Sequence, residues 1–130
     1  GYHYVKLALS LLDKVRSREN AGAVIFICTH VRLYVEPLQA GLEHFQEGYT
    51  AAMASGDNKF AIMNLCNFNL CKLFAGVNLR GLHESIVDAM RFSKEKKLLI
   101  FTVHLQQVQR TWSKLVGRGE EFEYSQEGRD

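Results

Sequence analysis

Apolar residues recur at helical spacing on both sides of the short polar segment Ser55-Gly56-Asp57, and this pattern constrains the fold most. Before the segment, apolar side chains follow one another at intervals of four, three, four and three residues: Leu38, Leu42, Phe45, Tyr49 and Ala52. This spacing places them on one face of an α-helix. The second stretch, 58–75, is apolar on nearly all sides, so a helix there must be covered by several neighbours. The sequence therefore predicts a helical hairpin at the centre of the fold.

Capping residues mark where these helices begin and end. The Asp57 carboxylate is expected to accept hydrogen bonds from the first backbone N–H groups of the second helix. Gly76 is expected to end that helix in a left-handed conformation. Pro37, the only proline, suits the first position of a helix, where its missing N–H would be unpaired in any case. Asn20 and Asn78 are the expected N-caps of two further helices.

The same periodicity predicts an all-α domain over residues 1–117. Segments 24–27 and 98–101 also favour a strand by propensity, but helical spacing explains more of their surroundings. Closely spaced glycines and charges predict a flexible tail or linker over residues 118–130. Gly41-Leu42 recurs as Gly81-Leu82, and a period of about 40 residues is within the range of helical solenoids. The expected helices form three antiparallel pairs and cover residues 3–16, 21–34, 37–54, 58–75, 79–94 and 97–116.

Composition narrows the classes of function. Apolar residues make up 47% of the 130 residues, as in an ordinary folded domain. The net charge of +2 gives no general attraction to nucleic acid or to a membrane. The longest apolar run, 21–28, is well short of the ~20 residues that span a bilayer. We expect neither partner, and we expect a cytoplasmic location. Because the chain begins with Gly1, we also expect it to be a piece of a longer polypeptide.

Groups that could carry chemistry are present, but not in the arrangements that catalysis needs. Three cysteines, Cys28, Cys66 and Cys71, read as reduced and buried thiols of an intracellular protein. Two carboxylate pairs at i, i+4 lack the Glu-x-x-His grouping of a di-metal bundle. Gly117-Arg118-Gly119 lacks the lysine of a phosphate loop. The sequence predicts no catalytic residue, cofactor or metal. The four carboxylates are Glu43, Glu47, Glu84 and Asp88.

Two groups of polar residues are candidates for binding a partner. Asn64, Asn67 and Lys72 interrupt the otherwise apolar helix 58–75. In one interpretation the asparagines grip the backbone of a partner; in the other they bond to neighbouring backbone, because buried amides must find partners. The second group forms a basic edge that is either a site for an acidic partner or a solvated turn: Arg91, Lys94, Lys96 and Lys97.

The hairpin resembles a tetratricopeptide unit, with Gly56-Asp57 in the turn and Ala61 where the paired helices approach closely. A longer pattern is similar to the helical-repeat region of very large signalling ATPases. In that family an AAA-type NTPase domain precedes tetratricopeptide-like helices, and sensor and kinase or cyclase domains share the chain. The resemblance covers about residues 4–117. It is carried by Pro37-Leu38, Gly48-Tyr49, Ser55-Gly56-Asp57 with Phe60-Ala61, and Ala75-Gly76-Val77-Asn78-Leu79.

The resemblance implies a right-handed stack of about three antiparallel helix pairs, a fragment of a tetratricopeptide-like α-solenoid. The expected function is a non-catalytic scaffold for protein interaction or signal relay within a larger ATPase-linked signalling protein. Its partner would be another protein or a neighbouring domain of the same chain. The alternative is a small self-contained helical enzyme that uses a thiol or a carboxylate site.

Overall fold

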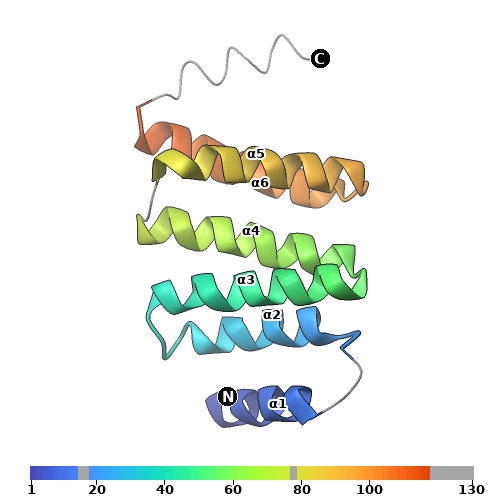
Figure 1. The fold of residues 1–130 in the computed structure, drawn as a ribbon. Coiled ribbons are helices and arrows are strands. Elements are labelled where there is room, and N and C mark those ends of the chain that lie inside the picture. Colours follow the sequence, from blue (N-terminus) through green and yellow to red (C-terminus); the bar gives the residue numbers. More distant parts are fainter. Residues whose placement is uncertain (15–17, 77–78, 118–130) are drawn as a thin grey trace.

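The computed structural model describes residues 1–14, 18–76 and 79–117, and within them the chain forms six α-helices and no β-strand. The predicted all-α class is confirmed (Figure 1). The expected tail, 118–130, lies outside the described residues. The helices are α1 (Tyr2–Lys14), α2 (Ala21–Arg32), α3 (Leu38–Ser55), α4 (Asn58–Ala75), α5 (Leu79–Glu95) and α6 (Leu99–Leu115).

Most predicted boundaries agree with the structure to within two residues. Helix α4 has the predicted bounds. Helix α2 ends two residues early, at Arg32, where the chain passes into tighter turns: the N–H groups of Tyr34 and Val35 donate to carbonyls three residues back, at 3.2 and 3.0 Å. Helix α6 begins two residues late, since Lys97 adopts a φ of 57°, which a right-handed helix does not allow.

The caps of the central hairpin are as predicted. The Asp57 carboxylate accepts a hydrogen bond from the N–H of Phe60 at 3.1 Å. Gly56 and Gly76 end α3 and α4 with φ angles of 75° and 66°. Asn20 occupies the N-cap position of α2, as predicted, but its side chain makes no capping hydrogen bond. Asn78 lies outside the described residues.

The even-numbered helices contact one another, α2 with α4 and α4 with α6. Helix α4 packs against α2, α3, α5 and α6, so the predicted central position of this helix is confirmed. Within the described residues, α2 contacts α4 and α4 contacts α6, whereas α1 does not contact α3 and α3 does not contact α5. Figure 1 shows that α2, α4 and α6 run in the same direction. We call these three helices the α2–α4–α6 layer.

A buried asparagine joins α4 to α2 and α3. The Nδ2 of Asn64 donates to the carbonyls of Phe60, at 2.8 Å, and of Gly22, at 3.2 Å. Gly48 of α3 makes room for this side chain, since a Cβ there would lie 2.2 Å from the Asn64 Oδ1. Gly22 permits a similar approach of α2 to Ala52 of α3. Two glycines thus allow three helix backbones to meet around one amide.

The largest apolar cluster lies among α4, α5 and α6. Its fully buried members include Ile62, Leu82, Ile86 and Leu105. Trp112 closes it at one end, where the indole N–H donates to the carbonyl of Leu79 and the ring stacks on His83 at a centroid distance of 4.8 Å. Each large aliphatic side chain buried in this way contributes about 1.5–3 kcal/mol to folding.

Candidate interaction surfaces

The three polar residues predicted on α4 point in different directions. Asn64 is fully buried and bonds to neighbouring backbone, so a partner cannot reach it in this structure. Asn67 is half-buried, and its Nδ2 donates to the carbonyl of Met63 at 2.9 Å. Lys72 follows five residues later, about 140° around the helix from Asn67. Its Nζ lies 4.6 Å from the centroid of the Phe68 ring. Asn67 also lines a hollow on the surface.

That hollow is a groove of about 230 Å³ across the α2–α4–α6 layer. Each of the three helices supplies part of its lining, and we call it the layer groove. Aromatic packing shapes one wall, because the Phe26 ring lies 5.8 Å from Phe60 and 6.1 Å from Phe45. The lining residues are Phe26, Met63, Cys66, Asn67, Ile100, Phe101 and His104.

Of these lining residues, only Asn67 and Cys66 stand out in the sequence as groups that could bind or react. Phe26 and Phe101 lie in stretches of helical apolar spacing, so the sequence indicates ordinary core residues at both positions. The useful signal is at Ile100, where an aliphatic residue falls outside the apolar face of its helix and is 75% exposed. Pairing such outlying residues from different helices requires knowing that α2, α4 and α6 lie side by side.

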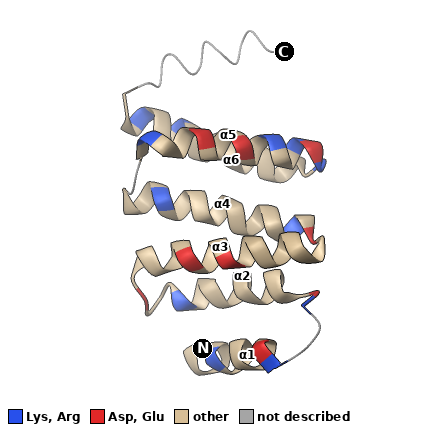
Figure 2. Cartoon of the chain, viewed as in Figure 1, with Lys and Arg blue, Asp and Glu red and all other residues tan. Residues whose placement is uncertain are grey.

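The basic edge lies at the end of α5 and in the turn to α6. Arg91, Lys94, Lys96 and Lys97 are all exposed. Arg91 forms an ion pair of 3.1 Å with Asp88, but both side chains are more than half exposed, at 65% and 69%, so the pair contributes little to stability. Figure 2 shows basic residues at the same end of α4 and α5.

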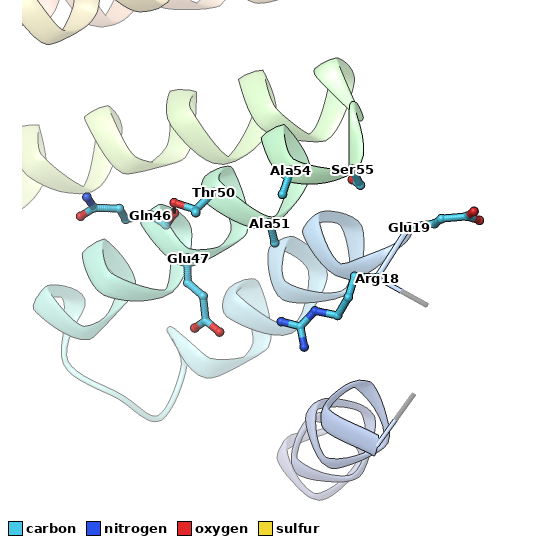
Figure 3. Close-up of a pocket in the computed structure, with 8 residues that line it drawn as sticks. All are labelled: Arg18, Glu19, Gln46, Glu47, Thr50, Ala51, Ala54 and Ser55. Carbon is cyan, nitrogen blue, oxygen red and sulfur yellow. Dashed lines mark hydrogen bonds between the residues drawn. The ribbon is translucent and has the colours of Figure 1, made fainter. Parts of the chain in front are cut away.

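A larger pocket, of about 630 Å³, lies on the other side of the molecule, between α3 and the connection from α1 to α2. Its lining residues come from α3 and from the two residues Arg18 and Glu19 shortly before α2. Figure 3 shows Arg18 and Glu47 extending toward this space from different segments. Most of its wall is the surface of α3, including Ala51, Ala54 and Thr50. Sequence reasoning did not find it, because it depends on how Arg18 and Glu19 lie against α3.

The cysteines are buried free thiols, as predicted. Burial raises the pKa of Cys66 to about 12. Burial likewise raises the pKa of Cys71 and, against the opposing charge of Arg32, that of Cys28. Because the thiolate is the reactive form, these shifts make all three thiols poor nucleophiles. Among the described residues, no three His, Cys, Asp or Glu side chains are grouped so as to hold a metal ion.

One carboxylate organises a polar cluster that sequence reasoning missed. Glu36, between α2 and α3, accepts hydrogen bonds from Arg32 at 3.0 Å, from His44 at 2.8 Å and from Tyr2 at 3.3 Å. Burial raises the pKa of Glu36, but the bonds from His44 and Arg32 outweigh it and lower the pKa overall. The cluster ties α1 and α3 to the end of α2. We call it the Glu36 cluster.

Comparison with protein-family models, curated proteins and solved structures found no match to this chain. Within the described residues, none of the helices combines the length and the apolar character needed to cross a membrane.

Proposed function

We propose that this chain is a non-catalytic scaffold for protein interaction or signal relay. The layer groove is the observation that carries the proposal. Three helices that are separated in sequence build one hollow, and apolar side chains line it. Ile100 is 75% exposed at its edge, and exposed apolar side chains around a hollow are typical of a protein-binding surface.

We further propose that the six helices are three antiparallel pairs of a right-handed, tetratricopeptide-like repeat. The contacts of α2 with α4 and of α4 with α6 support this, because stacked pairs bring equivalent helices of successive repeats together. The two tight approaches at Gly22 and Gly48 support it as well. In this proposal the chain is a segment of a larger, cytoplasmic, ATPase-linked signalling protein, and its partner is a protein or a neighbouring domain.

The alternative is a helical enzyme that uses a thiol or a carboxylate. The thiol and carboxylate groups of this chain support it less well than the layer groove supports a scaffold. The thiol of Cys66 lines the layer groove, but its pKa of about 12 leaves almost no thiolate at neutral pH. The four candidate carboxylates, Glu43, Glu47, Glu84 and Asp88, are all exposed. General acid catalysis uses a carboxyl group held in a cleft against its substrate, and side chains that extend into solvent do not provide this arrangement.

The test is site-specific photo-crosslinking of the full chain in cells that produce it. A photoreactive residue introduced at Asn67 probes the layer groove, and one at Thr50 probes the pocket on α3. We expect an identified protein adduct from position 67, and reconstitution with that purified partner should bind at least fivefold more weakly when Ile100→Ser is present. Adducts confined to position 50 would contradict the proposal. So would a clear rise in unfolding temperature with adenine nucleotides or divalent metals, because a scaffold has no site for them.

A further inference from the structure

Charge is distributed unevenly between the two sets of helices. Helices α2, α4 and α6 contain no Asp or Glu, and their basic residues are Arg32, Lys59, Lys72, Arg110 and Lys114. All 14 acidic residues of the chain therefore lie in the other helices, in the connections or after residue 117. The near-neutral total charge therefore hides a layer whose three helices contain basic residues and no acidic ones. A partner that docks on this layer meets no carboxylate from the helices that form it.

The basic residues nearest to one end of the layer groove come from two elements. Lys59 is the second residue of α4, and Lys96 and Lys97 lie in the short connection from α5 to α6. Helices α4 and α6 begin at the same end of the molecule (Figures 1 and 2). Two carboxylates also lie at this end: Asp57, which caps α4, and the exposed Glu95, the last residue of α5. Arg32 is different, because it is already paired with Glu36.

The apolar part of the groove is recessed. Phe26, Met63 and Phe101 are half-buried, whereas Ile100 and Val103 of α6 are 75% and 56% exposed at the surface. A protruding side chain can reach the recessed residues, but the flat surface of a membrane cannot. This shape favours a protein segment that carries apolar side chains.

We infer that the layer groove binds an acidic segment of a partner protein. Its apolar side chains enter the groove beside Phe26, Met63 and Ile100, and its carboxylates face Lys59, Lys96 and Lys97. Complementary charge fixes the orientation of the segment and speeds its association, while the apolar contacts supply most of the affinity. The inference rests on the proposed scaffold function and adds the chemistry of the partner.

The experiment measures fluorescence anisotropy of a short labelled peptide with the full chain. In the peptide, glutamates flank leucine and phenylalanine; a control peptide has glutamine in place of each glutamate. We expect the acidic peptide to bind about tenfold more tightly than the control. Its affinity should fall about fivefold between low and high salt, because exposed charges are screened. Equal affinity of the two peptides would overturn the inference.

Two lysines of α4 provide a matched pair of variants. Lys59→Gln removes a charge at the end of the groove, whereas Lys72→Gln removes one on a different side of the same helix. We expect a loss of about threefold for Lys59→Gln and no change for Lys72→Gln. A double variant, Lys96→Gln with Lys97→Gln, should lose about fivefold to tenfold. Equal losses for the two α4 variants would show a general charge effect and would overturn the inference.

Other occupants of the groove are distinguished in the same assay. Vesicles of anionic lipid and a short DNA duplex are added as competitors of the labelled peptide. If either displaced the peptide from the unsubstituted chain and bound more weakly to Ile100→Ser, the partner would be a membrane or a nucleic acid. The chain also holds acidic residues after Gly117. If replacing Glu120, Glu121 and Glu123 by Gln raised the peptide affinity tenfold or more, those residues would be the occupant. Each of these results would overturn the inference of a separate acidic partner.

The experiments distinguish failure of the acidic-partner inference from failure of the scaffold proposal. A purified partner that crosslinks at position 67 and depends on Ile100, but binds equally at low and high salt, leaves the scaffold standing and removes the acidic chemistry. The circular dichroism spectrum and unfolding temperature of each variant provide the control for folding, and Ile100→Ser is suitable because that side chain is exposed.

Discussion

The even-numbered and odd-numbered helices of this protein are built differently. Helices α2, α4 and α6 contact one another in series and contain no acidic residue. Helices α1, α3 and α5 contact only the helices adjacent in sequence, within the described residues, and contain acidic residues. The even-numbered helices thus form one continuous packed layer, and each odd-numbered helix packs against members of that layer. Substitutions should therefore cost most where they touch α4.

The largest expected effect is at Ile62, which is fully buried in α4. Ile62→Ala should lower the free energy of unfolding by about 3 kcal/mol, because it removes buried methyl groups and leaves a cavity. Leu7→Ala is the control, since Leu7 of α1 is 52% exposed and should change stability by less than about 0.5 kcal/mol. Urea denaturation measures both. A similar cost at both positions would break the distinction between α4 and the outer helices.

The next effect concerns the junction of α2, α3 and α4. Gly48→Ala should cost about 2 kcal/mol, because the new Cβ would lie 2.2 Å from the Asn64 Oδ1. Gly56→Ala is a matched control, since that glycine has a φ of 75° and open space around it. It should cost about 1 kcal/mol from backbone strain alone. Adding Asn64→Ala should relieve part of the Gly48→Ala penalty but none of the Gly56→Ala penalty; simple additivity in both would contradict the packing described here.

A smaller effect is expected at the start of α4. Asp57→Ala removes the carboxylate that accepts from the N–H of Phe60 and should cost about 1 kcal/mol in thermal or urea denaturation. Asp57→Asn, which can still cap, should cost less than half as much. If both variants lost the same stability, the charge near the helix terminus would matter more than the hydrogen bond.

The smallest effect tests how the odd helix α1 is attached. Glu36→Gln should cost about 0.5–1 kcal/mol near pH 7, because it weakens the bonds to Arg32 and His44. The pKa of Glu36 is lower in the folded state than its ordinary value of 4.5, so this stability is fully present above the ordinary value. It is lost as the pH falls through the folded-state pKa. Denaturation of both proteins from pH 7 to pH 3 should show the difference shrinking; a constant difference would exclude the ionised carboxylate as its cause.

Much of the fold is local and could be predicted. The bounds of α4, the cap at Asp57 and the glycine turns follow from spacing and from backbone chemistry within a few residues. The missing side-chain bond of Asn20 and the late start of α6 depend on local backbone conformations, at Lys97 for example, that residue identity does not specify. The buried position of Asn64 follows from periodicity only when the neighbouring glycines of α2 and α3 are known to face it.

The candidate site was much less predictable, because its residues come from separate helices. Asn67 was found as a polar interruption, but Lys72 was grouped with it and lies on another side of α4. Phe26 precedes Ile100 by 74 residues (100 − 26) and His104 by 78 (104 − 26), and no local pattern links Phe26 to the other two. The absence of acidic residues from three alternate helices was visible in the sequence, but its meaning depends on their lying side by side.

The most direct test of the layer groove is an amide chemical-shift map of the full, isotope-labelled chain during titration with the acidic peptide. The account predicts the largest shifts at Phe26, Met63, Ile100 and His104, which line the groove on three different helices. Shifts that instead centred on Thr50 and Ala54, in the pocket on α3, would contradict it.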